Sequence, residues 1–175
     1  HDPHAASSAA ISNLPQALDI RPIAHNSPEY QAAVTLLTIA MLPPAHLAGT
    51  ALRHAILRAP LGLHFTPEQL AAEADAWHLG AYLADRLVGY LLLKPLASGE
   101  LQMRQVAVDA TLQGQGIGRR LVNDAECRAR QHGMTAIRLH ARENAVPFYQ
   151  RLGYEVQGEP FMEIGLLHWR MAKQL

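Results

Sequence analysis

Apolar and polar residues alternate along several stretches of the chain, and we interpret each alternation as a β-strand. The first stretch is Leu18 to Ile23, and its strand is expected to end near Pro22. From Trp77 the strand period returns and persists for thirty-odd residues, interrupted by turn signals. The expected strands there are Trp77–Ala84 and Leu87–Leu96, which form an antiparallel hairpin through Asp85-Arg86, and then Leu101–Val108 after the Ser98-Gly99 turn.

Helical spacing appears between and after these strands. Ser27 and Pro28 provide an N-cap and a proline at the first helical position, so we expect a helix from there to about Leu42. Thr50–Arg58 and Thr66–Asp75 are two further helical candidates. A longer amphipathic helix, Gly116 to Gln131, should end at Gly133, and its apolar face consists of Ile117, Leu121, Val122, Ala125 and Ala129.

The last forty residues alternate between short strands and one short helix. We expect a buried strand at Thr135–His140, a helix at Ala145–Leu152, and final strands at Tyr154–Gln157 and His168–Ala172. Between those two strands, Gly158–Leu167 is predicted to be a loop long enough to line a site.

Length and composition indicate one globular domain. The chain has 175 residues, of which 49% are hydrophobic, enough to form a core but too few for two domains. We assign residues 16–175 to this domain and 1–15 to a disordered tail or a remnant of expression. Fifteen basic residues balance fifteen acidic ones, which favours neither a nucleic-acid partner nor a membrane surface. The single cysteine and the lack of a long apolar run predict a cytoplasmic protein.

The most informative segment is the glycine-rich turn after the third long strand, Gln113-Gly114-Gln115-Gly116-Ile117-Gly118. A strand enters the turn and a helix follows it. This order presents unpaired backbone N–H groups and the positive end of a helix dipole to whatever lies above the turn. The turn is therefore predicted to bind a phosphate.

Two common phosphate motifs do not fit this turn. A P-loop requires Gly-Lys-Ser/Thr, but Arg119 and Arg120 follow Gly118. The dinucleotide fingerprint requires G-x-G-x-x-G and an acidic residue about twenty positions further on, and this segment has G-x-G-x-G without that acid. An ordinary turn, whose glycines only supply positive φ, is the structural alternative.

Gln113-x-x-Gly116-x-Gly118 resembles the Arg/Gln-x-x-Gly-x-Gly/Ala signature of the GNAT superfamily of N-acetyltransferases. The resemblance implies an α/β (α+β) fold with a mostly antiparallel, twisted sheet that is splayed at its two central strands. It implies acetyl-CoA as cosubstrate, with the pyrophosphate on the turn and the pantetheine arm along the preceding strand. The cofactor-binding residues expected from it are Val106, Ala107, Val108, Gln113, Gly114, Gln115, Gly116, Ile117, Gly118, Arg119 and Asn144, and Arg120 is an alternative to Arg119.

A second block, Asn144 to Tyr154, is similar to the family's Asn-x-x-Ala-x-x-Phe-Tyr-x-x-Leu-Gly-Phe/Tyr segment with a shortened start. The resemblance places Tyr149 near the sulfur of the cofactor as the catalytic hydrogen-bond donor. Because a phenol titrates near 10 and a thiol near 8.5, full proton transfer from Tyr149 is uphill unless its pKa is lowered. Phe148 and Leu152 lie on one helical face and are expected to be core residues.

The resemblance implies an acyltransferase that moves an acetyl group to a primary amine of a small molecule or peptide, by direct attack in a ternary complex. A non-catalytic acyl-CoA sensor is the alternative. The base is open among Glu100, His140, Glu163 and His168. Glu163 to His168 resembles a Glu-x-Gly-Ile-x-His segment of some acetyltransferases, so Glu163 and His168 are the first candidates for substrate contact.

The remaining expectations concern the acceptor side and other ligands. Arg53, Arg58 and the Leu61–Thr66 loop are candidate acceptor contacts. The ten histidines form neither H-x-H nor H-E-x-x-H, so no metal is predicted. Cys127 is expected to be a packing residue of the amphipathic helix. The family resemblance also allows a homodimer.

Overall fold

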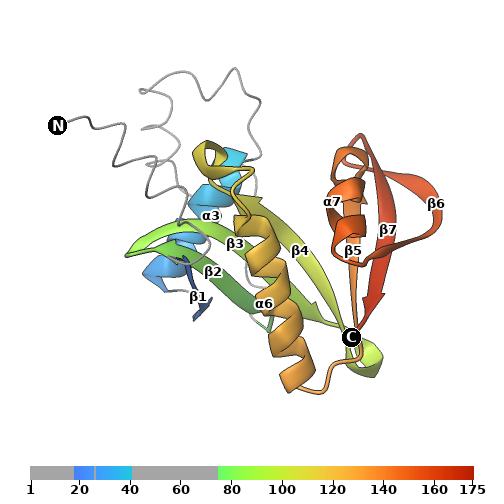
Figure 1. Ribbon diagram of the computed structural model, residues 1–175, viewed down its shortest axis with the longest axis horizontal. Coiled ribbons are helices and arrows are strands. Elements are labelled where there is room, and N and C mark those ends of the chain that lie inside the picture. The colour runs from blue at the N-terminus through green and yellow to red at the C-terminus, as the bar shows by residue number, and fades with distance from the viewer. Residues whose placement is uncertain (1–17, 26, 41–74) are drawn as a thin grey trace.

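The computed structural model describes residues 18–25, 27–40 and 75–175, and these form a seven-stranded sheet in the order β1-β2-β3-β4-β5-β7-β6 (Figure 1). All neighbouring strands are antiparallel except β4 and β5, which are parallel and central. This is the fold class that the sequence predicted. The strands are β1 Leu18–Ile23, β2 Trp77–Leu83, β3 Arg86–Pro95, β4 Glu100–Val108, β5 Ala136–Arg142, β6 Glu155–Glu163 and β7 Leu166–Gln174.

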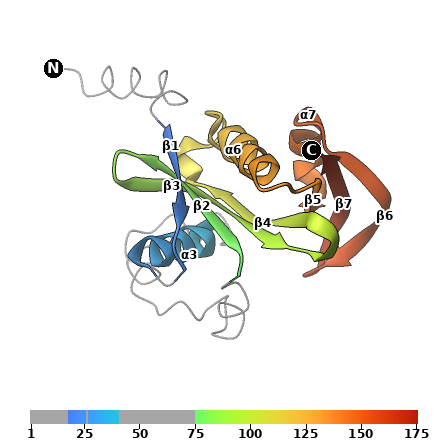
Figure 2. The same cartoon turned by 90° about the horizontal axis from the view of Figure 1, so that it is seen from below.

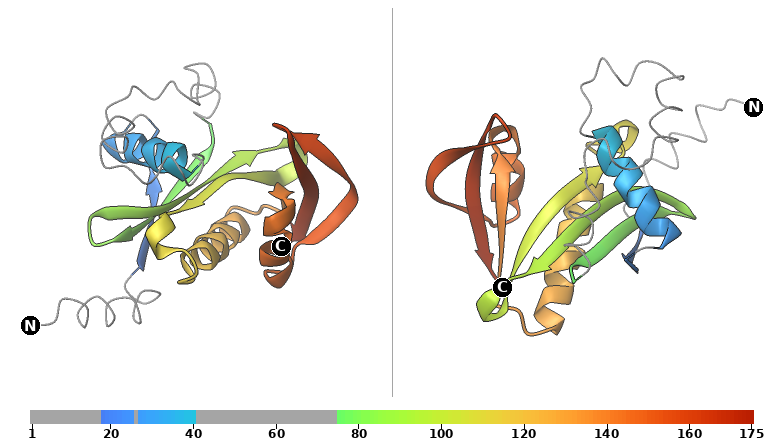
Figure 3. Two further views of the ribbon diagram at one scale, coloured as in Figure 1. Left: turned by 90° about the horizontal axis from the view of Figure 1, so that it is seen from above. Right: turned by 180° about the vertical axis from the view of Figure 1, so that it is seen from behind.

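Helices cover both faces of the N-terminal half of the sheet (Figures 2 and 3). Helix α6, Ile117–Gln131, lies on one face, and all five residues of its predicted apolar stripe are buried. Helix α3, Pro28–Ala40, covers the opposite face with Tyr30, Val34 and Leu37. The Ser27 hydroxyl accepts a hydrogen bond from the Tyr30 amide at 3.1 Å, which confirms the predicted N-cap. No described helix is long and apolar enough to cross a membrane.

Several sequence predictions lie outside the described residues. These are the tail, the helix at Thr50–Arg58, most of the helix at Thr66–Asp75, and the acceptor contacts Arg53, Arg58 and Leu61–Thr66.

The two central strands pair over only part of their length. Pairing of β4 with β5 runs from Glu100–Ala136 to Met103–Leu139 and then stops, although both strands continue. In the same region β4 has one extra residue relative to β3, because Tyr90 pairs with Ala107 and Leu92 pairs with Arg104. Gln105 lies in this bulge with φ of 57°. The bulge bends β4 away from β5, so the edge that faced β5 is open beyond Met103.

The C-terminal strands differ from the prediction. Gly158–Leu167 is not a long loop, because β6 continues to Glu163 and joins β7 through the two-residue turn Ile164-Gly165. Gly158 (φ 74°) and Pro160 interrupt the alternation, and a register shift between Gln157 and Phe161 accommodates them. A strand with a bulge was therefore interpreted as a loop.

Two burial predictions were also wrong. Strand β5 is not buried on both faces: Arg138, His140 and Arg142 are exposed, since no described helix covers the face opposite α7, Val146–Arg151. Cys127 is exposed on α6 instead of packed, because it lies off the stripe that faces the sheet.

A buried ion pair ties α6 to the C-terminal strands. The Glu126 carboxylate, 3% exposed, accepts hydrogen bonds from the Lys173 ammonium at 2.7 Å and from the Tyr154 hydroxyl at 3.3 Å. The ammonium also donates to the Leu152 carbonyl at 2.7 Å, at the end of α7. Glu126 therefore fixes α7 and β7 relative to α6.

We expect Glu126→Gln to lower the free energy of unfolding by about 2 kcal/mol, because it leaves the Lys173 ammonium without a carboxylate. This loss is smaller than for a fully buried pair since the Lys173 side chain is 23% exposed. Urea denaturation measures it. Glu143→Gln, at an exposed position before α7, is the control and should change stability by less than about 0.5 kcal/mol. Equal stability of the two variants would contradict the assignment.

Candidate active site

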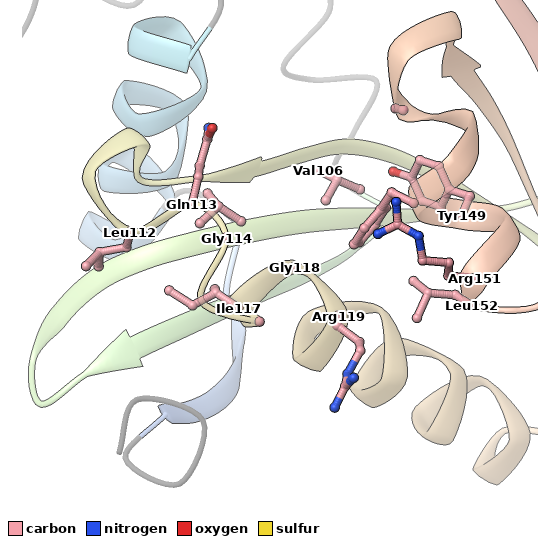
Figure 4. Close-up of a pocket in the computed structure, with 14 residues that line it drawn as sticks. Val106, Leu112, Gln113, Gly114, Ile117, Gly118, Arg119, Tyr149, Arg151 and Leu152 are labelled. Carbon is pink, nitrogen blue, oxygen red and sulfur yellow. The ribbon is translucent and has the colours of Figure 1, made fainter. Parts of the chain in front are cut away.

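A cavity of about 620 Å³ opens between the N-terminus of α6 and helix α7, with β4 as its floor (Figure 4). It lies where β4 and β5 have separated, so the open edge of β4 faces into it. Its wall combines the glycine-rich turn on one side with aromatic, aliphatic and arginine side chains of α7 on the other. The lining residues are Val106, Val108, Leu112, Gln113, Gly114, Gly116, Ile117, Gly118, Arg119, Ala145, Phe148, Tyr149, Arg151 and Leu152.

Asp109 anchors the turn that leads into the glycines. Its carboxylate accepts hydrogen bonds from the Thr111 amide at 2.9 Å, the Thr111 hydroxyl at 2.7 Å and the Arg86 guanidinium at 2.6 Å. Burial raises the pKa of Asp109, but these hydrogen bonds and the charge of Arg86 outweigh it and hold that pKa below its ordinary value. Asp109 is therefore ionised at neutral pH and fixes the start of the turn.

The glycines of the turn adopt a conformation that other residues seldom tolerate. Gly114 has φ of 80° and Gly116 has φ of 86°, and Gly116 is the N-cap residue of α6. The first N–H groups of α6 have no partner within the helix, and its first turn contains no acidic residue. These donors and the helix dipole give this end of the cavity the positive potential that favours an anion.

The opposite wall is formed by one face of α7. Phe148, Arg151 and Leu152 are three and four positions apart and share this face. Phe148 and Leu152 were expected to be core residues, and both do pack against the core; they also line the cavity. The sequence did not single out Arg151, whose guanidinium extends toward the cavity (Figure 4). The shared helical spacing was a signal that could have found it.

Tyr149 lies at the inner end of the cavity with its hydroxyl directed toward Val106 (Figure 4). Its ring packs edge-on against Phe148 and Tyr154, with centroids 5.0 and 5.8 Å away, and the residue is 8% exposed. Burial raises the pKa of Tyr149 to about 12, because it disfavours the phenolate. The hydroxyl is therefore a hydrogen-bond donor at working pH, and full proton transfer from it is even less favourable than at its ordinary pKa.

The structure brings most of the predicted cofactor residues together at one cavity, and three of them do not line it. Val106, Val108, Gln113, Gly114, Gly116, Ile117, Gly118, Arg119 and Tyr149 line it. Among those expected, Ala107 packs into the core beneath α3, while Gln115, Asn144 and the alternative Arg120 do not line the cavity. Of the adjacent residues Arg119 and Arg120, Arg119 is therefore the one that lines the cavity. Leu112 and Ala145 line the cavity as well and were not predicted.

Three of the four candidate bases lie together on the face of the C-terminal strands that points away from α7. They are His140, Glu163 and His168. Glu163 Oε2 is 3.6 Å from His140 Nδ1 and 3.6 Å from His168 Nε2. Glu100 is not part of this group and forms an ion pair with Arg138. The hydrogen bond from Arg138 lowers the pKa of Glu100, and the charge of Arg138 acts in the same direction. Burial raises that pKa by less. Among the described residues, no group of three or more His, Cys, Asp or Glu side chains could hold a metal ion.

Comparison with known proteins identifies the chain as an acyltransferase and gives its family. Residues 63–175 match the model of the acetyltransferase (GNAT) domain, and the chain therefore belongs to the GNAT acetyltransferase family. It is 29% identical over 120 residues to the uncharacterized N-acetyltransferase YitI of Bacillus subtilis. The matched region covers 63% of this chain and 78% of that protein. It is 26% identical over 121 residues to the uncharacterized protein YyaT of the same organism, covering 63% and 82%.

Solved structures agree with this fold. A candidate N-acetyltransferase from Lactobacillus plantarum superimposes with a TM-score of 0.69 at 26% identity, over 91% of this chain and 99% of that one. A GNAT family acetyltransferase from Elizabethkingia anophelis, solved with acetyl-CoA bound, gives 0.63 at 17% identity over 91% and 99%. An aminoglycoside 6'-N-acetyltransferase complexed with coenzyme A gives 0.65 at 18% identity over 89% and 96%.

We expect Gly116→Ala to weaken acetyl-CoA binding at least about tenfold, because a Cβ is strained at a φ of 86° and the turn must shift its N–H groups. Isothermal titration calorimetry measures the affinity. Gly133→Ala is the matched control: its φ is 73°, a Cβ there also has nothing within 4 Å, and it lies beyond the far end of α6. Both variants should lose about 1 kcal/mol of stability, and only Gly116→Ala should lose affinity.

Proposed function

We propose that this protein is an N-acetyltransferase that moves the acetyl group of acetyl-CoA to a primary amine of a small molecule or a peptide, by direct attack in a ternary complex. The observation that carries the proposal is the cavity itself. It joins an anion-binding helix N-terminus to a buried phenol through an open strand edge. Those three features match the diphosphate, the thioester sulfur and the amide-rich pantetheine arm of one molecule.

The cofactor would lie along β4. Its diphosphate would accept hydrogen bonds from the turn between Gln113 and Gly118, with Arg119 and Arg151 contributing positive charge from the two walls. Its pantetheine amides would pair with the open edge at Val106 and Val108, as an added strand pairs with a sheet. Phe148 and Leu152 would contact the arm's aliphatic portion.

The chemistry would take place where the arm ends, between β4 and Tyr149. Attack by a neutral amine on the thioester carbonyl forms a tetrahedral oxyanion, which a backbone N–H of β4 between Val106 and Val108 would stabilise. The C–S bond then breaks and negative charge develops on sulfur. The Tyr149 hydroxyl, protonated because its pKa is about 12, would donate a hydrogen bond to that sulfur.

Tyr149→Phe is expected to lower kcat about 100-fold while leaving the affinity for acetyl-CoA within a factor of three, because only charge developing on sulfur uses the hydroxyl. Thiol release over a panel of primary amines measures kcat, and calorimetry measures the affinity. In the wild-type protein, Tyr149 should stay protonated below pH about 10, because its pKa is about 12. Its ionisation should therefore not lower the rate in that pH range.

Tyr82→Phe on β2, outside the cavity lining, is the control for that substitution and should retain wild-type kcat. The panel includes alkylamines, amino acid amides, peptides and an aminoglycoside, since one structural neighbour is an aminoglycoside 6'-N-acetyltransferase. Tight acetyl-CoA binding without turnover of any amine would favour the non-catalytic sensor. Absence of binding at millimolar acetyl-CoA would contradict both functions.

Arg119→Gln and Arg151→Gln should each weaken acetyl-CoA binding about tenfold, because each removes a charge-assisted contact with a phosphate. The same substitutions should leave the affinity for S-acetylpantetheine, which lacks the diphosphate and the nucleotide, within a factor of two. Calorimetry with the two ligands separates loss of phosphate recognition from damage to the cavity. Equal losses for both ligands would show that the arginines act on the fold and not on the phosphates.

A further inference from the structure

His140, Glu163 and His168 form a compact cluster on the face of the C-terminal strands opposite Tyr149, and we call these three residues the acceptor cluster. They come from β5, β6 and β7, and Glu163 Oε2 is 3.6 Å from a ring nitrogen of each histidine. Their neighbours Leu139 and Ala141 point the other way, into the core that contains Tyr149. The cluster and Tyr149 therefore lie on opposite faces of the same strands, and Figure 2 shows α7 on one of these faces.

The position of the cluster along β5 connects it to the cavity. The last residue of β5 that pairs with β4 is Leu139, opposite Met103, so His140 is the first residue beyond the point where the strands part. A group bound at the cluster would face the opening in the sheet from the side opposite Tyr149. Attack on a thioester held in that opening would proceed from this side.

Hydrogen bonding fixes the tautomer of His168. Its Nδ1 is 2.9 Å from the Leu166 carbonyl oxygen, which can only accept, so the ring donates from Nδ1. In the neutral ring the lone pair is then on Nε2, and Nε2 faces the Glu163 carboxylate, which is also an acceptor. The His168 side chain is only 9% exposed, and a proton placed between the two acceptors would satisfy both.

A primary ammonium group can supply this proton. It carries three N–H donors and no acceptor, and the acceptor cluster presents a carboxylate oxygen and the lone pair of His168 Nε2, with His140 Nδ1 beside them. We propose that the acceptor cluster binds the acceptor amine in its ammonium form and that His168 Nε2 removes a proton from it. This inference rests on the proposed function and adds to it the base and the residues that hold the amine.

Two arginines on this face lie next to the cluster in the strand register. Arg142 is opposite His168 in the β5–β7 register, and Arg170 is opposite His140. The Arg170 guanidinium lies over the Phe161 ring, 4.2 Å from its centroid. Phe161 also contacts both histidine rings, at centroid distances of 4.9 Å for His140 and 5.9 Å for His168, and thus holds the two imidazoles in place.

The proton and bond changes balance without another reactant. One N–H proton of the ammonium moves to His168 Nε2, and the imidazolium is paired with Glu163. The freed lone pair forms the C–N bond, and the C–S bond breaks when the tetrahedral intermediate collapses. A second N–H proton ends on the departing sulfur, which leaves as the thiol of coenzyme A. His168 then releases its proton to solvent, so that one ammonium and one thioester give one amide, one thiol and one proton.

The test compares Glu163→Gln and His168→Gln in the full chain with the wild-type protein. Each substitution should lower kcat/KM for the best amine of the panel about 100-fold or more, the usual contribution of a positioned base, and should leave acetyl-CoA affinity within a factor of three. The pH profile of kcat/KM should differ between the wild-type protein and His168→Gln, because the variant has no imidazole to take the proton from the ammonium.

Matched controls are available for both substitutions. Glu159→Gln lies on the same strand as Glu163, and His132→Gln is at the exposed end of α6, so both should retain wild-type kinetics. Should His168→Gln fail to fold, Glu163→Gln still decides the question, since the Glu163 side chain is 42% exposed. Long-range proton–nitrogen spectra of the wild-type histidine rings at alkaline pH should show His168 protonated on Nδ1, and protonation on Nε2 would overturn the assignment.

The possible outcomes separate the acceptor cluster from the function on which it rests. Wild-type turnover with both variants strongly impaired and the pH profile changed supports the cluster. Turnover within threefold of wild type in both variants, with the same pH profile, overturns the cluster and leaves the acetyltransferase standing. Binding of acetyl-CoA with no turnover of any primary amine by the wild-type protein overturns both.

Discussion

The site depends on the early end of pairing between β4 and β5. Parallel strands ordinarily hydrogen-bond along their length, but here the ladder stops at Met103 and Leu139. The bulge at Gln105 supplies the local cause, because an extra residue in β4 turns the strand while it keeps its pairing with β3. The result is an unpaired strand edge inside the protein, beside a cavity large enough for an extended ligand arm.

An opening in a sheet has to be supported from outside, and two helices do so. The buried stripe of α6 packs on β2 to β4, while α7 packs on β5 and β7, so each side of the opening has its own helix. The Glu126–Lys173 pair and the Lys173 contact with Leu152 join these two bodies. The anion-binding end of α6 and the phenol of Tyr149 are thereby held at a fixed separation, which catalysis by positioned groups requires.

Local patterns predicted the first hairpin and the caps of two helices well and the C-terminal strands poorly. The hairpin at Asp85, the Ser27 cap and the start of α6 depend on neighbouring residues, and all three agree with the structure. Strand β6 was interpreted as a loop, since Gly158 and Pro160 break its alternation and only pairing with β7 keeps it extended. Phe148 and Leu152 were assigned to the core because helical spacing shows a shared apolar face but not whether a cavity borders it.

The sequence by itself determined the family and the glycine-rich turn, since positive φ, free N–H groups and a helix start are properties of contiguous residues between Gln113 and Gly118. It also singled out Tyr149. Only the tertiary structure decided which side chains face that turn, and which candidate bases meet. Arg151 reaches the cavity because α7 packs on β5, and His140, Glu163 and His168 meet because three strands pair in one register. Register is set by packing and hydrogen bonding between segments distant in the chain, so no local pattern contains it.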